Sequence, residues 1–471
     1  MIRQDRQHPL PSQERRADRP AGRAGALDDA TLDGFFAELA SRFEEALLRH
    51  AVPGGALALH YYGREWTGAF GVTNIAYPLP THDETLFQVG GITRLVTALA
   101  VAILVEQGKL DWDEPVRAYL PTLRLADPRV AERVTARQLL NHTAGWYGDD
   151  RGGGESGPDA AARYLSRLAS APQLLPLGWR FSINDSAYVV AGRLLEVLTG
   201  QRYAAAVRDL IFEPLGMTRA LFDPREVVTT RYAIGHALEG GRPKVEPTWT
   251  VVPPVLAPAG GLCASARDLL RLGRALKGSG TTLLSEESLA ALHTPTTDPG
   301  VLEREELAGF GLGVMVWEGS GGRYFGQSGS TTWQHARLVY HPEADFVLVL
   351  LTNAAAGEQA IAEVLPFALE RYTGIHAAPL SFAELPPSAL DELTGRYGFA
   401  DPRLGPLIAI TLREDGLRFE YGGEARLAPL APDVVVVADG PRRGQRAEFL
   451  RDSGGSVNWL RFGGKVYPRL R

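Results

Sequence analysis

The chain contains a single cysteine, Cys263, among its 471 residues. One cysteine excludes an internal disulfide, so the fold cannot depend on a covalent cross-link, and the sequence is compatible with a reducing compartment. No recognisable catalytic partner stands near Cys263 in the sequence. We therefore interpret this residue as a small core residue rather than a nucleophile.

The sequence also lacks an excess of positive charge and a long apolar segment. Lys and Arg total 49 against 55 Asp and Glu, a net charge of −6, which gives no support to a nucleic-acid partner. The longest apolar run, residues 95–105, is too short to span a bilayer. Residues 1–26 are polar, Arg-rich and without the apolar core of a secretory signal. We expect a disordered tail, no membrane span and a cytoplasmic location.

What the sequence does contain is an ordinary globular composition, with 45% hydrophobic and 22% charged residues. Its length predicts two or three domains. Hydrophobic periodicity predicts helices over residues 27–50, 93–106, 135–141, 187–198 and 266–277. Alternation predicts a hairpin at 56–62 and 65–72 and later strands at 311–317, 332–340 and 346–351. Helices placed between a first hairpin and a late set of strands predict an α+β domain, in which helices flank an antiparallel sheet.

The pattern changes after residue 375. A Pro-rich linker over residues 376–389 leads into short alternating segments. Residues 408–412 and 417–421 flank Glu414-Asp415-Gly416, and residues 447–450 and 457–462 flank Ser453-Gly454-Gly455. Strands joined by such turns predict a small β-barrel. We therefore divide the chain into a tail (1–26), a first domain (27–375), a linker (376–389) and a barrel domain (390–471).

Five motifs occur in a characteristic order: the segment from Phe87 to Val116, Leu139-Leu140-Asn141-His142-Thr143-Ala144-Gly145, Pro214-Leu215-Gly216-Met217, Ala259-Gly260-Gly261-Leu262 and Leu351-Thr352-Asn353. Over roughly residues 30–375 the chain resembles the superfamily of serine β-lactamases, penicillin-binding proteins, DD-peptidases and related esterases. Residues 390–471 resemble the lipocalin-like domain that often follows this fold. The resemblance implies a β-lactamase/DD-peptidase-like domain followed by a lipocalin-like barrel, and an architectural role for His142.

The three catalytic clusters of that superfamily are all altered. The Ser-x-x-Lys motif becomes Gly91 and Arg94, the Tyr-x-Asn motif becomes Ile183 and Asp185, and the basic position of Lys-Thr-Gly or His-x-Gly becomes Gln327. Gly91 has no side chain to attack a carbonyl, and Arg94 stays protonated and cannot be a general base. No serine in the chain is followed three residues later by lysine. We predict that acyl-serine chemistry is lost.

The residues at the altered positions are chemically compatible with one another. In the superfamily fold the Lys and Asn positions face one another, so the resemblance implies an ion pair between Arg94 and Asp185. This pair is either purely structural or functional. In a functional site, Arg94 holds a substrate carboxylate, or Asp185 acts as a general base with a pKa raised by burial. Arg94, Asp185 and Gln327, which can orient a ligand by donor and acceptor together, are the candidate catalytic residues.

A double-mutant cycle tests this pair. Breaking one side of a buried ion pair costs about 3–5 kcal/mol, so Arg94→Ala and Asp185→Ala are each expected to lower the thermal stability. If the two residues interact, the double variant loses less than the sum of the single losses. Additive losses would show that they do not interact.

Further residues are expected to contact a ligand in the same pocket. They are Gly91, Thr93, Asn184, Tyr147, Trp146, Ser328 and Trp333. Gly91 leaves bare helix-start amides for an anionic or carbonyl oxygen. The aromatic residues form a wall for a small molecule, with plain core packing as the equal alternative, and Thr93 is more consistent with packing than with chemistry.

Three functions from different classes remain open. In the first, the pocket acts on a small acyl, peptidyl or carboxylate-bearing molecule by acid/base, cyclase- or isomerase-like chemistry without a covalent step, in a biosynthetic pathway. In the second, the chain is a catalytically inactive binding or regulatory protein. In the third, it is a hydrolase with a rewired nucleophile. We expect a small-molecule partner and neither a cofactor nor a metal, because no His-Glu-x-x-His, Cys-x-x-Cys or Walker pattern occurs. The sequence leaves the oligomeric state open.

Overall fold

The computed structural model describes residues 28–149, 155, 157, 159–246, 252–302, 305–376, 380–440 and 442–470. The expected disordered tail lies outside these residues. The described chain forms two compact units, each assembled from three segments. Unit 1 comprises the chain up to Ile103, Ala204–Leu289 and Gly319–His376, and unit 2 comprises Leu104–Tyr203, Ala290–Glu318 and Ala377–Arg471. The linear boundaries that the sequence predicts are untested by this division and stay a prediction.

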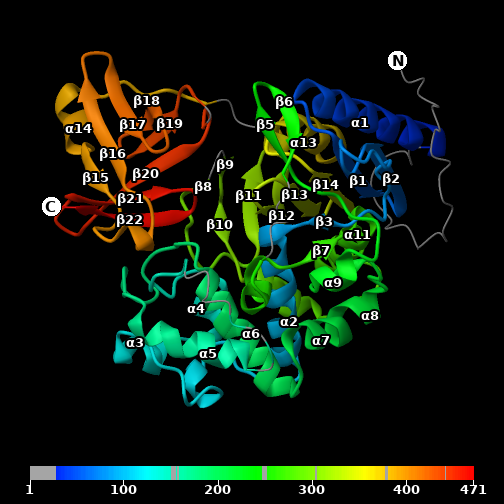
Figure 1. The fold of residues 1–471 in the computed structure, drawn as a ribbon, viewed down its shortest axis with the longest axis horizontal. Helices are drawn as coiled ribbons and strands as arrows, with labels where there is room; N and C mark the ends of the chain where they lie inside the picture. Colours follow the sequence, from blue (N-terminus) through cyan, green and yellow to red (C-terminus); the bar gives the residue numbers. More distant parts are fainter. Residues whose placement is uncertain are drawn as a thin grey trace. The chain divides into compact units, whose positions relative to one another are not determined.

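Unit 1 is built on an antiparallel sheet (Figure 1). Its strands lie in the order β12 (Gly322–Ser330), β13 (His335–His341), β14 (Phe346–Thr352), β1 (Gly54–Tyr61) and β2 (Arg64–Gly71). The hairpin of β1 and β2 is the one that the alternation predicts. Every residue of β1 and β14 is buried, because these central strands are covered on both faces.

Helices cover the two faces of this sheet. The ring of Phe346 stacks on Tyr372 of α13 (Gly357–Thr373), with centroids 5.6 Å apart. The next residue, Val347, contacts Gly273 of α11 (Ala266–Lys277) on the opposite face, since successive strand residues point in opposite directions. Helix α1 (Asp29–Arg49) packs beside α13, where its Phe43 approaches Gly55 of β1. The α+β prediction is confirmed.

Short elements complete unit 1. Strands β3 (Phe87–Gln88), β7 (Cys263–Ala264) and β4 (Ala220–Leu221) form a small sheet, and β5 (His236–Glu239) pairs with β6 (Arg242–Val245). The helices outside the main layers are α8 (Glu213–Leu215), α9 (Pro224–Val227) and α10 (Ala257–Gly260). Three more, α2 (Thr93–Glu106), α7 (Tyr203–Val207) and α12 (Glu286–His293), lie partly in unit 1 and partly in unit 2. The bounds of α2 and α11 are those that the periodicity predicts.

Unit 2 contains a helical part and a barrel. The helical part consists of α3 (Pro128–Arg133), α4 (Ala136–Leu140), α5 (Ala160–Arg167) and α6 (Asp185–Thr199), with α14 (Pro387–Glu392) before the barrel. Short strands β8 (Val301–Leu302), β9 (Glu305–Glu306), β10 (Gly309–Phe310) and β11 (Met315–Gly319) follow the helical segment in sequence. Helix α6 ends at Gly200 in the left-handed conformation, a common helix terminator because glycine tolerates a positive φ.

The C-terminal part is a closed barrel of eight antiparallel strands, drawn in orange and red in Figure 1. The strands are β15 (Gly395–Tyr397), β16 (Ile408–Arg413), β17 (Gly416–Glu420), β18 (Glu424–Ala431), β19 (Val434–Val437), β20 (Arg446–Arg451), β21 (Val457–Phe462) and β22 (Lys465–Leu470). Alternate residues fill its interior, among them Ile408, Ile410, Phe419 and Phe449. Closure leaves no unpaired edge in the barrel, and the predicted lipocalin-like barrel is confirmed.

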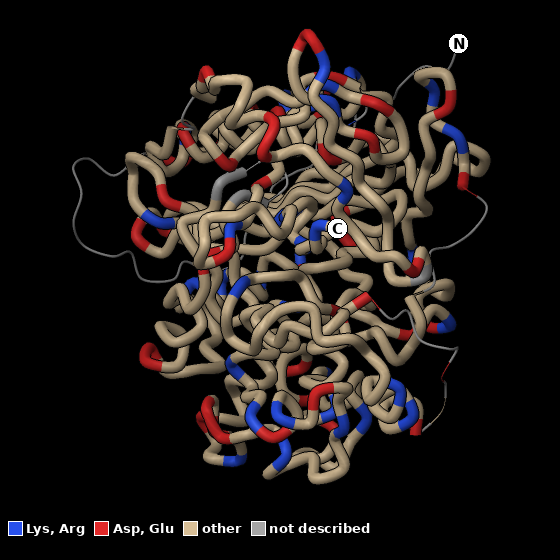
Figure 2. Tube along the Cα trace, turned by 90° about the vertical axis from the view of Figure 1, so that its left-hand side faces the viewer, with Lys and Arg blue, Asp and Glu red and all other residues tan. Residues whose placement is uncertain are grey.

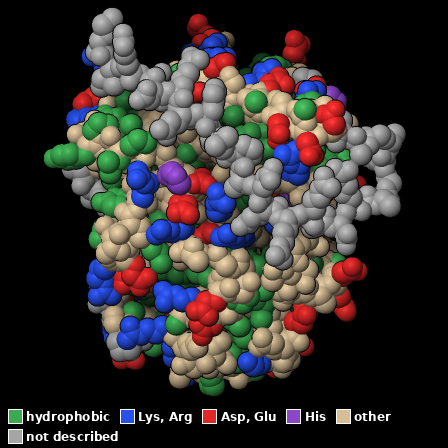
Figure 3. Space-filling view, turned by 90° about the vertical axis from the view of Figure 1, so that its right-hand side faces the viewer, with side chains coloured by type: hydrophobic (Ala, Val, Ile, Leu, Met, Phe, Trp, Pro, Cys, Tyr) green, Lys and Arg blue, Asp and Glu red, His purple; other side chains and the backbone are tan. Residues whose placement is uncertain are grey.

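The surface carries both signs of charge. Figures 2 and 3 show acidic and basic residues interspersed, with neither sign gathered in one region of the faces they present. Within the described part of the chain, no helix combines the length and apolar character that crossing a membrane requires.

Candidate functional site

The start of α2 is held by the backbone that precedes it. Gln88 N–H donates to the side-chain oxygen of Gln334 at 3.0 Å, and Val89 N–H donates to the carbonyl of Leu262 at 3.1 Å. A single 3-10 turn, Gly90–Ile92, then leads into the helix. The Ala259-Gly260-Gly261-Leu262 motif therefore fixes the position of Gly91.

Glycines allow this turn to touch strand β12. A Cβ atom on Gly90, whose φ is +45°, would lie 2.4 Å from the carbonyl oxygen of Ser330, and one on Gly329 would lie 1.8 Å from the carbonyl oxygen of Val89. Both distances are shorter than van der Waals contact, so neither position accepts a larger residue without a backbone shift. Strand and helix start thus meet backbone to backbone.

The space beside Gly91 is already filled. A Cβ atom at this position would lie 2.7 Å from the carbonyl oxygen of Ser328 and 2.9 Å from Nη1 of Arg94. Arg94 is half-buried, one turn further along α2. The place of a side chain on residue 91 is therefore taken by a backbone acceptor and a guanidinium group.

Thr93 uses its hydroxyl group within the scaffold. The hydroxyl donates to the carbonyl of Gly90 at 2.7 Å and accepts from the N–H of Leu262 at 3.1 Å, and the residue is fully buried. Its single donor is thus engaged. These contacts fit the packing role that the sequence favours.

Gln327, Ser328 and Trp333 lie on or after β12. The side chain of Gln327 is 1% exposed, and its Oε1 accepts from the N–H of Ser328 at 3.2 Å. Trp333 lies in the turn between β12 and β13, where its Cβ leaves no room for a side chain on Gly235. Unit 1 thus brings Gly91, Arg94 and Ser328 into contact, and Gln327 comes directly before Ser328 on the strand.

Asn184 and Asp185 belong to unit 2, where they begin α6. Asn184 caps the helix, because its Oδ1 accepts from the N–H of Ala187 and the hydroxyl of Ser186, both at 2.8 Å. Its Nδ2 donates to the carbonyl of Trp146 at 2.8 Å. At most one amide hydrogen of Asn184 remains for a ligand. Asp185 is half-buried at the first helical position.

Two of the aromatic residues predicted to line the pocket, Trp146 and Tyr147, differ in how deeply they are buried. Trp146 is 3% exposed and donates from Nε1 to the hydroxyl of Ser186 at 2.7 Å. Tyr147 is half-buried, and its ring lies 5.9 Å from that of Phe399 in an edge-on arrangement. Of the two, Tyr147 is the one that retains exposed surface. Phe399, which follows β15, was not singled out by the sequence patterns, since it belongs to the barrel part of the chain.

His142 has an architectural environment. Its backbone has a φ of +61°, its Nδ1 accepts from the N–H of Asn184 at 3.1 Å, and its ring packs against Phe181, Tyr188 and Phe310. Cys263 is buried in β7, where desolvation raises the pKa of its thiol to about 12. A thiol with such a pKa is almost never ionised at neutral pH and is a poor nucleophile.

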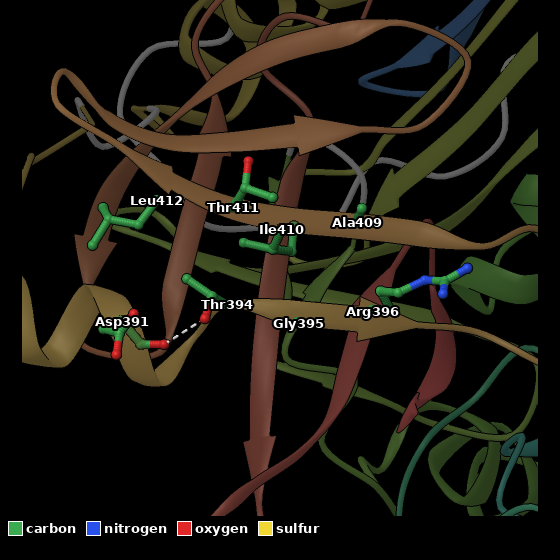
Figure 4. A pocket seen from close by; sticks show the side chains of 8 residues that line it. All are labelled: Asp391, Thr394, Gly395, Arg396, Ala409, Ile410, Thr411 and Leu412. Carbon is green, nitrogen blue, oxygen red and sulfur yellow. Dashed lines mark hydrogen bonds between the residues drawn. The ribbon is translucent and has the colours of Figure 1, made fainter. Parts of the chain in front are cut away.

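A shallow pocket of about 340 Å³ lies on the barrel between β15 and β16, next to α14 (Figure 4). Its lining residues are Asp391, Thr394, Gly395, Arg396, Ala409, Ile410, Thr411 and Leu412. The hydroxyl of Thr394 donates to the carbonyl of Asp391 at 2.8 Å. None of the candidate site residues lines this pocket, and we assign it no role.

Comparisons with known proteins identify the family. The Beta-lactamase family matches residues 37–371. The chain belongs to this family. Its fold is that of the β-lactamase and penicillin-binding-protein superfamily, as the sequence resemblance predicts.

Relatives cover most of the chain. Penicillin-binding protein 4 of Amycolatopsis lactamdurans is 30% identical over 366 residues, which span 76% of this chain and 96% of that protein. The crystal structure of SurE matches with a TM-score of 0.77 at 27% identity, covering 93% of this chain and 100% of that one. The structure of SurE with D-Leu matches with a TM-score of 0.75 at 25% identity over the same shares.

Proposed function

We propose that this β-lactamase-family protein recognises a small acyl, peptidyl or carboxylate-bearing molecule and acts on it without forming an acyl-enzyme. In this proposal Arg94 binds a carboxylate or carbonyl oxygen of the ligand, Gln327 orients it and Asp185 is the general base of an acid/base, cyclase- or isomerase-like step. The reaction belongs to a cytoplasmic biosynthetic pathway.

One observation carries the proposal. The position at which the family places its nucleophile is Gly91, and the space next to it is taken by the Ser328 carbonyl and the Arg94 guanidinium. An acyl-enzyme requires a nucleophile with a base within hydrogen-bond reach, and a guanidinium is always protonated. The same guanidinium is well suited to a carboxylate, because its planar donors match the two carboxylate oxygens. SurE with D-Leu gives a relative whose ligand carries such a carboxylate.

A second candidate function is ligand binding without catalysis. It is favoured by the residues at the start of α2, because Gly91 has no side chain and Arg94 stays protonated, so that neither can serve as a nucleophile or a general base. Product analysis with a panel of small carboxylates and acyl peptides separates the two functions. Turnover that is lost in Asp185→Asn while binding is kept supports the enzyme, and binding without turnover supports the binding protein.

Both candidate functions require that the protein forms no acyl-enzyme, and covalent probes test this requirement. The purified protein is expected to remain unlabelled by a fluorescent penicillin and by a fluorophosphonate, because the nucleophile position lacks an attacking group. Labelling is measured by in-gel fluorescence and intact mass, with a serine β-lactamase of the same family as the positive control.

A stable adduct on any side chain would overturn the proposal, and peptide mapping of that adduct would identify the rewired nucleophile of the third function. In the same samples, D-leucine is expected to raise the melting temperature of the native protein but not that of Arg94→Ala. Equal shifts in both proteins would exclude Arg94 as the carboxylate ligand.

A further inference from the structure

The segment Ser182–Asp185, the Ser182–Asp185 loop, leads into α6 and carries two of the altered positions, Ile183 and Asp185. On one side, its backbone and that of the first turn of α6 bond to a single neighbouring segment. Ser182 N–H donates to the carbonyl of His142 at 2.9 Å, and Asn184 N–H donates to the ring of the same histidine at 3.1 Å. Ser186 N–H donates to the carbonyl of Gly148 at 3.1 Å. The His142–Gly148 segment therefore anchors one side of the loop.

The other side of the loop is bound by the barrel. Ile183 N–H donates to the carbonyl of Gly464 at 2.8 Å, and the hydroxyl of Ser182 accepts from the N–H of Val466 at 3.2 Å. Lys465, between these two barrel residues, forms an ion pair with Asp149, and both side chains are 29% exposed. Two hydrogen bonds thus join this turn of the barrel to the Ser182–Asp185 loop, and the ion pair joins it to Asp149, the residue after the His142–Gly148 segment that holds the other side of the loop.

The geometry of this turn is set by its sequence. Phe462 pairs with Lys465, and the two glycines between them have φ values of +57° and +74°. Positive φ at both central residues is typical of a type I′ turn, which needs glycine or asparagine and gives a tight two-residue hairpin. The carbonyl of Gly464 is therefore aimed by a rigid hairpin rather than by a loose loop.

Apolar packing fixes the hairpin in place. Leu175, Leu450 and Val466 are buried together, with Trp179 and Trp459 packed against them. The two tryptophan rings lie 4.9 Å apart and are edge-on. Barrel strands β20 to β22 are thus attached by apolar packing to the segment before the Ser182–Asp185 loop. Because this packing excludes water, the neighbouring hydrogen bonds between the hairpin and the loop are stronger than they would be in solvent.

We propose that the β21–β22 hairpin of the barrel is a positioning element for the Ser182–Asp185 loop, holding Ile183 and Asp185 in register through Gly464, Lys465 and Val466. The barrel is then a structural half of the site rather than a separate module. The inference rests on the proposed function only for the catalytic role of Asp185. The attachment of the hairpin to the loop does not depend on any ligand.

Hydrogen exchange of the Ser182–Asp185 peptide in the full-length protein tests this inference. The double variant Ser182→Ala/Lys465→Met removes one hydrogen bond and one ion pair while leaving the apolar contact. The Ile183 amide is expected to exchange about fivefold faster or more, because each lost polar contact weakens the attachment by a net amount near one hydrogen bond. Arginine keeps the positive charge that pairs with Asp149. The double variant Ser182→Ala/Lys465→Arg is therefore expected to exchange its Ile183 amide no faster than Ser182→Ala alone.

Lys244→Met is the matched control, since Lys244 forms an exposed ion pair with Glu239 on another hairpin. It is expected to leave the exchange of Ile183 unchanged. Unchanged exchange in the double variant with a folded barrel would overturn the inference. D-leucine binding is measured in parallel: if the wild type binds no D-leucine, the proposed ligand class is contradicted, whereas the exchange result still decides whether the hairpin positions the loop.

Discussion

Gly91→Ser is expected to destabilise the protein by about 1–3 kcal/mol and to leave it unlabelled by penicillin. A Cβ atom at this position lies 2.7 Å from the Ser328 carbonyl oxygen and 2.9 Å from Nη1 of Arg94. The carbonyl belongs to strand β12, so it moves only if the strand moves. Even with a hydroxyl present, the residue three positions later is an arginine, which cannot accept the proton. Urea denaturation measures the first effect, and intact mass after incubation with penicillin measures the second.

Gly34→Ser is the matched control. Gly34 lies on α1, and a Cβ atom there meets nothing within 4 Å. Serine has a higher helix propensity than glycine, so this variant is expected to be as stable as the wild type or slightly more stable. If Gly91→Ser were as stable as Gly34→Ser, or if penicillin labelled the introduced hydroxyl, the site would be an intact acyl pocket that lacks only its nucleophile.

Asp345→Asn is expected to lower the free energy of unfolding by about 3 kcal/mol at pH 7, because it leaves a buried charge without its partner. The Asp345 carboxylate accepts from Lys277, from His60 at 3.0 Å and from the N–H of Gly63 at 2.9 Å. The side chains of Lys277 and His60 are only 4% and 3% exposed. Asparagine keeps the size of the side chain and tolerates the φ of +51° at this position, so the change isolates the charge.

The effect of Asp345→Asn depends on pH in a defined direction. Burial raises the pKa of the Asp345 carboxyl, but the hydrogen bonds and charges of His60 and Lys277 outweigh burial and hold the pKa below its usual value of 3.8. A carboxyl with a lowered pKa stabilises the folded state above the unfolded pKa, and this contribution is lost as the pH falls towards the folded pKa. The stability difference between wild type and variant is therefore expected to be complete at pH 7 and to shrink below about pH 4.

Asp113→Asn serves as the control for this second prediction. Asp113 pairs with Arg137 at the surface, where its side chain is 64% exposed. Such pairs contribute about 1 kcal/mol or less. A loss in Asp345→Asn no larger than that in Asp113→Asn, measured by urea denaturation at pH 7, would show that Lys277 finds another partner or that water solvates it.

Elements with a strong local pattern could be predicted from the sequence. The apolar run of α2, the serine cap of α11 and the Gly63-Arg64 hairpin are local features, and their bounds agree with the structure within a few residues. Strand β12 was not identified by alternation, because its sequence is mostly polar and contains three glycines, at 322, 326 and 329. It is a strand because β13 pairs with it from Phe325 to Ser330.

In the candidate site, too, the sequence predicts local features but not the contacts between distant segments. Resemblance gave the order of the motifs and the altered positions, but it could not assign the hydrogen bonds of Thr93 and Asn184, which depend on residues 169 and 38 positions away. Likewise, Phe399 and the hairpin after Phe462 were read only as barrel sequence. Their contacts with Tyr147 and Ile183 join segments more than 250 residues apart, and no local pattern encodes such a distance.

The sequence by itself determined that residue 91 has no side chain and that residue 94 carries a permanent charge, because these are properties of glycine and arginine in any fold. Only the tertiary structure decided that a strand carbonyl and the guanidinium occupy the space beside Gly91, and that a barrel turn binds the loop at Ile183. Both are contacts between distant segments, and packing, rather than composition, fixes which atoms meet.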